Sequence, residues 1–217
     1  MATGGVLDDS AAGTDQQFTD DELRAIMTTA HTLGRKVAAH AHGLAGIRAA
    51  VLAGVDSIEH GSYINDEAIA EMKKRGTYLV PTLYLEDWML EKGTLPAFYH
   101  QKMIDVSAVA KSNIKHAMQA GVKIALGTDA AVYPHGLNAH ELDVYVNQLG
   151  MAPLAALQSA TINAADLMGL TAKTGTLEPG KWADIVAVDK NPLDDVRILQ
   201  NVKFVMKSGV VYKNETK

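Results

Sequence analysis

The 217-residue sequence contains no cysteine, which excludes disulfide bonds, thiolate metal sites and cysteine nucleophiles. It has no apolar run near the roughly 18 residues that a membrane-spanning helix needs. The longest runs cover residues 49–55 and 77–85. The first ten residues include neither a basic region nor an apolar core, so we expect no signal peptide on this chain. An excess of positive charge is absent too, since the net charge is −5, and this excludes a nucleic-acid partner.

Together these absences predict a cytoplasmic protein with no nucleic-acid or membrane partner, although a preceding segment of a longer protein could carry a signal peptide. Two groups of catalytic motifs are also missing. The sequence has no GxSxG nucleophile elbow, and it has neither of the complete glycine-rich motifs GxGxxG and GxxxxGK[ST] that bind nucleotide phosphates. A serine hydrolase and a nucleotide-binding protein are therefore poor interpretations.

A unit of helix and buried strand repeats through the first part of the chain. Thr19 and Glu22 have the spacing of a capping box and predict a helix that ends near Gly34, and the next two helices are predicted to end at Gly54 and Gly76. Buried strands are predicted at residues 36–41, 55–60, 77–82 and 123–127. Later helices are predicted at residues 96–120, 138–149 and 153–167, with an extended loop at 85–95. This order predicts a parallel sheet with right-handed crossovers.

The pattern changes to antiparallel β after residue 175. Short strands separated by Pro-Gly and Ser-Gly turns are predicted at residues 182–188, 202–206 and 210–212. We therefore predict an α/β protein with two parts, a β/α part over residues 1–170 and a small β segment over residues 171–217.

Polar side chains stand at the predicted carboxyl ends of three strands. His40 and His42 end the first strand, His60 ends the second, and Asp129 follows the fourth. The carboxyl ends form the working face of parallel β/α folds, while the rest of these strands is apolar. Imidazole nitrogens with a carboxylate oxygen form a ligand set for zinc, or for manganese, cobalt or iron. The combination favours a metal site at His40, His60 and Asp129.

These residues also have other interpretations. A single histidine at a strand end is more often a hydrogen-bonded structural residue than a ligand. His42 lies two residues from His40, on the same strand face, so it is a candidate substrate-binding donor, an alternative ligand or a rim residue bonded to the next loop. Asp129 has a second candidate role, because a carboxylate beside a metal-bound water can accept its proton.

Several motifs then carry a family resemblance. VAAHAHG, VDSIEHG, LVPTL and ALGTDA occur in this order, and the tail contains ATINAADLMGL and GTLEPGKWADIVAVDKNPLDD. As a set they resemble the second half of the amidohydrolase superfamily barrel. The tail is similar to the C-terminal helix and β-sandwich of imidazolonepropionase-like and Xaa-Pro dipeptidase-like members, and the resemblance covers essentially the whole chain.

The resemblance implies the C-terminal half of a (β/α)8 TIM-type barrel, about four βα units, followed by a small β-sandwich segment. It implies a metal-dependent hydrolase of amide or other C–N bonds. A dipeptide-like or cyclic amide substrate would be attacked by metal-activated water, with one or two divalent metals, of which zinc is the first candidate.

The resemblance also assigns roles by position. His40 and His60 match the metal-binding histidines of the family's fifth and sixth strands, and Asp129 matches the eighth-strand aspartate that binds metal and shuttles the proton. Further residues on or near the loops at the top of the barrel are candidates for substrate binding: His42, Tyr84, His135 and His140.

The sequence departs from the family in two features. Family members have an HxH pair on the first strand and commonly a carboxylated lysine or a glutamate at the end of the fourth, and neither has a counterpart here. If His40 and His42 were the first-strand pair, a lysine, two later strand-end histidines and an aspartate should follow, but only His60 and Asp129 do. The fifth-strand interpretation is preferred, and the chain is expected to be a truncated form that begins just past the lysine position.

Three hypotheses follow. The first is the C-terminal part of a metal-dependent amidohydrolase, in which three ligands still hold one metal. The second is a half-barrel that closes by self-association into a homo-oligomer, because four strands leave exposed edges. The third is a catalytically inactive remnant or a binding module that keeps the fold without the chemistry.

Overall fold

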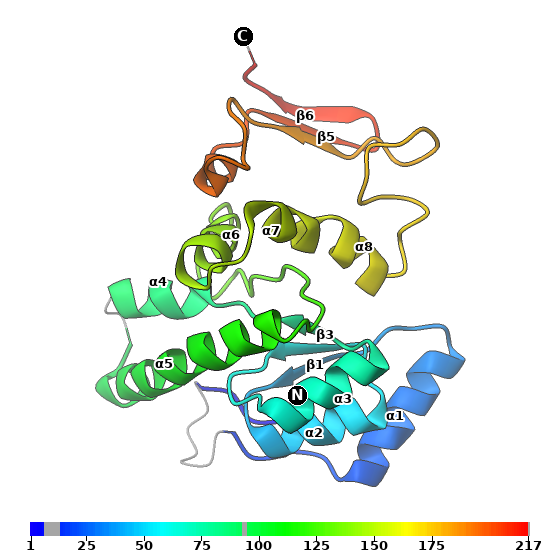
Figure 1. The fold of residues 1–217 in the computed structure, drawn as a ribbon, viewed down its shortest axis with the longest axis vertical. Helices are drawn as coiled ribbons and strands as arrows, with labels where there is room; N and C mark the ends of the chain where they lie inside the picture. The colour runs from blue at the N-terminus through cyan, green and yellow to red at the C-terminus, as the bar shows by residue number, and fades with distance from the viewer. Residues whose placement is uncertain (7–13, 93–94, 217) are drawn as a thin grey trace. The chain divides into compact units, whose positions relative to one another are not determined.

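The structure is a computed structural model that describes residues 1–6, 14–92 and 95–216. The chain forms two compact units, Met1–Asp129 and Ala130–Lys217 (Figure 1). The first unit contains α1 (Asp20–Thr32), β1 (Ala38–Ala41), α2 (Leu44–Ala53), β2 (Ser57–His60), α3 (Asp66–Arg75), β3 (Tyr78–Val80), α4 (Tyr84–Lys92) and α5 (Ala97–Gln119). The second contains α6 (His140–Asp143), a π-helical turn (Val144–Gln148), α7 (Pro153–Ala160), α8 (Ile162–Leu167), β4 (Ile185–Ala187), a 3₁₀ helix (Val196–Gln200), β5 (Phe204–Lys207) and β6 (Val210–Asn214).

The first unit is built on a parallel sheet with the strand order β1-β2-β3. The predicted fourth strand is reduced to one parallel bridge between Leu79 and Ile124. There the Leu79 N–H donates to the Lys123 carbonyl (2.9 Å), and the Leu79 carbonyl accepts from the Ala125 N–H (3.1 Å). The predicted α/β fold with a parallel sheet is confirmed, although each strand is shorter than expected.

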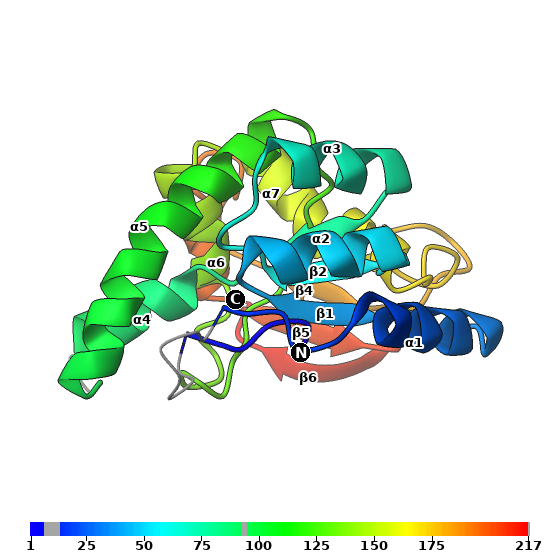
Figure 2. The ribbon, with the colours of Figure 1, turned by 90° about the horizontal axis from the view of Figure 1, so that it is seen from below.

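Helices α1, α2 and α3 cover one face of this sheet (Figure 1, Figure 2). α2 packs between α1 and α3 and contacts both β1 and β2. Its Ile47 and Val51 are fully buried, as are Ile58 of β2 and Leu79 of β3. Burial of each such side chain contributes about 1.5–3 kcal/mol, so this layer supplies much of the core of the unit and fixes the strands that carry the site.

The helix ends follow the predicted local signals. At α1 the Thr19 hydroxyl accepts from the Glu22 N–H, and the Glu22 carboxylate accepts from the Thr19 N–H at 2.8 Å. α2 and α3 end at Gly54 and Gly76, whose φ angles of 99° and 74° are left-handed and therefore suit glycine. The capping box and both glycine stops are confirmed.

The extended loop predicted at residues 85–95 is wrong, because α4 occupies most of that segment. Its buried residues are Glu86 and Met89, three apart and therefore on one helical face, and α4 packs against α5. A glutamate on the buried face conceals the apolar spacing by which a helix is predicted from sequence.

The second unit contains an antiparallel sheet with the order β4-β5-β6, which confirms the three short strands predicted for the tail. The helix predicted at residues 153–167 is interrupted at Thr161, where φ is −126° and ψ is −86°, so that two helices form. The predicted division of the chain into residues 1–170 and 171–217 stays a prediction. Within the described ranges, no helix combines the length and apolar character needed to cross a membrane.

Candidate metal centre

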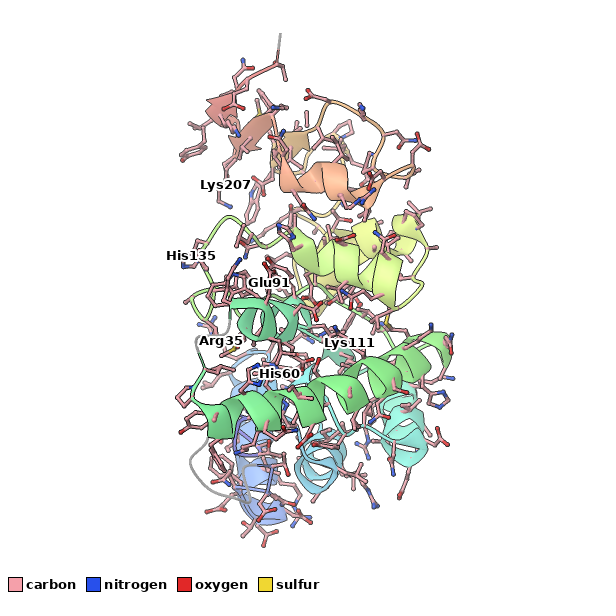
Figure 3. The ribbon with its side chains drawn as sticks, turned by 90° about the vertical axis from the view of Figure 1, so that its left-hand side faces the viewer. Arg35, His60, Glu91, Lys111, His135 and Lys207 are labelled. Atoms are coloured by element: carbon pink, nitrogen blue, oxygen red, sulfur yellow. The ribbon has the colours of Figure 1, made fainter. Side chains whose placement is uncertain are left out.

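Three histidines meet at the carboxyl end of the parallel sheet. His40 lies in β1, His42 follows the end of that strand, and His60 is the last residue of β2. Each offers one ligand atom within 4.8 Å of the other two, and the ring centroids are 4.6 to 4.8 Å apart. His42 and His60 stack with 9° between their planes, and both are buried; His60 is labelled in Figure 3. Three imidazoles at this spacing offer nitrogen donors to one ion.

Left-handed backbone conformations occur where the strand segments end. The φ angle is 70° at His60, 56° at Thr82 and 52° at Asp129. Residues other than glycine rarely adopt this conformation, which costs roughly 1–3 kcal/mol in each case. The repeated β/α unit therefore places a polar side chain in the same strained turn three times, and strain of this kind clusters at functional sites.

Hydrogen bonds fix which nitrogen of His60 carries the proton. Its Nδ1 lies 2.6 Å from the Thr82 hydroxyl, and that hydroxyl donates its proton to the Pro81 carbonyl at 2.7 Å. The hydroxyl can therefore only accept from His60, which must donate through Nδ1–H. This leaves the lone pair of Nε2 free for a metal, the arrangement that hydroxyl and carboxylate partners give to metal-binding histidines.

The other two rings are held in a similar way. His42 Nδ1 lies 2.8 Å from the Ser62 hydroxyl, and the His42 backbone N–H donates to the Thr3 hydroxyl at 2.9 Å. His40 Nε2 faces the Gly4 carbonyl at 3.4 Å. A carbonyl can only accept, so His40 donates through Nε2–H and its Nδ1 carries the lone pair.

The cluster is electrically neutral at physiological pH. Burial is the main cause that lowers the pKa of His42 to about 2 and that of His60 to about 3, and repulsion from the neighbouring histidines adds to it. Burial lowers the pKa of His40 as well. Neutral imidazole is the form that binds metals, so three neutral rings, two of them buried, fit a divalent ion.

Asp129 acts electrostatically on His40 of this cluster and on the neighbouring carboxyl group of Glu59. The negative charge of Asp129 opposes the lowering of the His40 pKa. The pKa of Glu59 is raised, chiefly by burial and then by Asp129, while the Ser57 hydroxyl donates to Glu59 Oε1 at 2.5 Å and opposes the rise. Glu59 was not among the predicted site residues; the signal that could have found it is the strand register, which pairs Glu59 with His40 on one face.

The remaining predicted residues lie elsewhere on the chain. Tyr84 is the first residue of α4 and is half-buried, and burial raises its pKa. His135 is exposed in the loop before α6, and His140 is the first residue of α6. Both histidines belong to the second unit, and their role in substrate binding, like that of Tyr84, stays a prediction.

Comparison with known proteins identifies the family. Residues 1–212 match the model of the amidohydrolase family. The chain belongs to this family. The resemblance stated from the strand-end motifs and the tail is thereby confirmed for almost the whole length of the chain.

Two relatives in sequence and one solved structure show what share of a similar protein this chain covers. Ochratoxinase of Aspergillus niger is 39% identical over 221 residues, which cover 98% of this chain and 45% of that protein. Imidazolonepropionase of Symbiobacterium thermophilum is 34% identical, covering 78% of this chain and 37% of that protein. A crystal structure of a Xaa-Pro dipeptidase with methionine in its active site superposes with a TM-score of 0.92 at 41% identity, over 98% of this chain and 53% of that one. The chain therefore spans about half the length of the relatives it matches.

Proposed function

We propose that this chain is the metal-binding C-terminal part of a (β/α)8-barrel hydrolase that cleaves amide or other C–N bonds in small substrates. The observation that carries the proposal is the cluster of three neutral imidazoles at the carboxyl end of a parallel sheet, with ligand atoms within 4.8 Å of one another. Membership of the amidohydrolase family supports the same reaction class. The small antiparallel sheet would then belong to the β-sandwich segment that follows the barrel.

In this proposal His40, His60 and Asp129 hold a divalent metal, with zinc as the first candidate, and His42 is an alternative ligand. The donor set supports this, because the free lone pairs identified above lie on Nδ1 of His40 and Nε2 of His60. When bound, the metal supplies a Lewis acid that polarises a substrate carbonyl and lowers the pKa of a bound water.

The side chains of the chain have separate tasks. Asp129 accepts the proton of the attacking water at a carboxylate oxygen and returns it to the leaving nitrogen. Thr82 and Ser62 hold the rings of His60 and His42 in place through the hydrogen bonds to Nδ1. Oriented ligands of this kind reduce the reorganisation needed when the reaction occurs.

The proposed substrate is a small molecule with a dipeptide-like amide bond. This proposal draws on the Xaa-Pro dipeptidase, which is 41% identical over nearly the whole chain. Tyr84, His135 and His140 are proposed to contact the substrate, and a cyclic amide is the second substrate class, as the imidazolonepropionase relative suggests.

Hydrolysis of a Xaa-Pro dipeptide by the zinc- or manganese-loaded chain tests the proposal. We expect release of proline that a chelator abolishes and that His60→Ala reduces at least about a hundredfold, because one ligand is lost. His116→Ala is the matched control, since His116 is exposed and its Nε2 atom lies 2.6 Å from an Asp66 carboxylate oxygen; its rate should equal that of the unmodified chain. A chain that holds zinc but shows no chelator-sensitive hydrolysis would contradict the proposed reaction and leave the metal site standing.

A further inference from the structure

Residues 2–4 lie beside β1, and Ala2 and Thr3 are hydrogen-bonded to it at His40. The Ala2 and Thr3 N–H groups both donate to the His40 carbonyl, at 2.8 and 3.4 Å. On their other side, Thr3 forms an antiparallel bridge with Gln16. Ala2 is 2% exposed and Thr3 is fully buried, so this segment is part of the core rather than a loose end.

Two glycines, Gly43 and Gly46, leave room for the backbone segments that contain Thr14 and Thr3. A Cβ atom at Gly46, in the first turn of α2, would collide with the Thr3 methyl group and approach the Ala2 carbonyl oxygen to 2.9 Å. A Cβ atom at Gly43 would collide with the Thr14 carbonyl. The turn that follows His42 is therefore shaped to receive the segment that contains Thr3.

The hydroxyl of Thr3 links two of the candidate ligands. It accepts from the His42 backbone N–H at 2.9 Å and donates its own proton to the Gly4 carbonyl at 2.8 Å. The same Gly4 carbonyl accepts from His40 Nε2–H at 3.4 Å. A single buried hydroxyl thus holds the backbone at His42 and orients the acceptor that faces His40.

We propose that Thr3 is a positioning residue of the metal centre. By fixing the Gly4 carbonyl it keeps the proton of His40 on Nε2 and presents Nδ1 to the ion, and by holding the His42 N–H it fixes the chain between the two histidines. The inference rests on the proposed function, because it assumes that the histidine cluster binds a metal.

Zinc affinity of three variants tests this role. Thr3→Val keeps the shape but loses the hydroxyl, and we expect zinc to bind about tenfold more weakly or worse. Thr3→Ser restores the hydroxyl and should return the affinity to within about twofold of the unmodified chain. Thr77→Val is the matched control: Thr77 is also buried and donates to the Val55 carbonyl at 3.1 Å, at the amino-terminal end of the strands, away from the histidines. Its zinc affinity should not change, even if it destabilises the chain as much as Thr3→Val.

The outcomes separate the two claims. If the unmodified chain binds no zinc, the proposed function fails. If it binds zinc and Thr3→Val binds equally well, or if Thr3→Ser is as weak as Thr3→Val, the role of Thr3 is refuted while the metal site stands.

A second measurement needs no variant and so does not depend on how Thr3→Val folds. In metal-free unmodified chain, ¹⁵N NMR of the imidazoles should show His40 protonated at Nε2 and His60 protonated at Nδ1, because a carbonyl and a hydroxyl whose proton is already donated face those atoms. Protonation of His40 at Nδ1 would overturn the proposed link from Thr3 through Gly4.

Discussion

Glu86 is an ionisable side chain enclosed by the contact between α4 and α5. Only 6% of the residue is exposed, Ser107 donates a hydrogen bond to its carboxyl group, and its Oε2 atom has no hydrogen-bond partner among the residues that the structure describes. Burial raises the pKa of Glu86 to about 7, and the Ser107 hydrogen bond opposes this only in part. The adjacent Asp87 forms an ion pair with Lys111, labelled in Figure 3.

The raised pKa predicts that Glu86 destabilises the folded chain as the pH rises. The folded protein keeps this proton up to about pH 7, whereas the unfolded chain releases it near the ordinary glutamate pKa of 4.5. The stability that protonation contributes is complete below pH 4.5 and is lost as the pH rises through about 7. At 1.36 kcal/mol per pKa unit, the loss is about 3 kcal/mol.

Urea unfolding of Glu86→Gln checks this prediction. Relative to the unmodified chain, Glu86→Gln should gain about 3 kcal/mol in the free energy of unfolding between about pH 4.5 and pH 8. Glu91→Gln, at an exposed position of the same helix, is the control and should show no such gain. Parallel pH profiles for Glu86→Gln and the unmodified chain would contradict the assignment.

The polar residues at the strand ends could be predicted, but the residues that hold them could not. His40, His42 and His60 stand out in the sequence because a polar side chain at the end of an apolar strand is costly without a partner. Thr82, Ser62 and Thr3 give no comparable signal. Serine and threonine occur throughout the sequence, so a hydroxyl at one position does not indicate a functional role. Which histidine each hydroxyl contacts depends on strand register and on the left-handed turns that follow the strands.

At the scale of elements, the contact between β3 and the segment around Ile124 is the narrowest part of the parallel sheet, with one bridge. Gly127 lies against Val80 of β3, and a Cβ atom at Gly127 would collide with a methyl group of that valine. This close approach brings the segment that carries Asp129 beside the strand end at Thr82.

We predict that Gly127→Ala destabilises the chain by about 1–3 kcal/mol, because the added methyl group overpacks this contact. In a Val80→Ala background the colliding methyl group is absent, so the cost of Gly127→Ala should largely disappear. A double-mutant cycle of unfolding free energies measures this coupling. An equal cost in both backgrounds would show that the collision is not its cause.

Elements with local end signals were predicted well, whereas elements defined by packing were not. The capping box of α1 and the glycine stops of α2 and α3 are encoded within a few residues. α4 was missed because its buried face includes Glu86, and the break at Thr161 has no glycine or proline to announce it. The fourth strand was predicted from an apolar run, but strand pairing is a long-range property, and within the described part of the chain this run forms a β-bridge at Ile124 alone.

At the scale of the whole molecule, the chain has two compact units and spans about half the length of its relatives. The family could be identified from the sequence because its motifs occur in order over almost the whole chain. The sequence pattern changes to antiparallel β after residue 175, whereas the compact units divide at Asp129, because local sequence pattern and tertiary packing are different properties. Self-association stays a prediction.

The central claim of this account is that His40, His60 and Asp129, with His42 as an alternative ligand, form a binding site for one divalent metal. Isothermal titration of the metal-free chain with zinc tests it most directly. We predict one ion per chain, binding weakened at least about a hundredfold in His60→Ala and unchanged in His116→Ala. Failure of the unmodified chain to bind zinc, or equal binding by His60→Ala, would contradict the account.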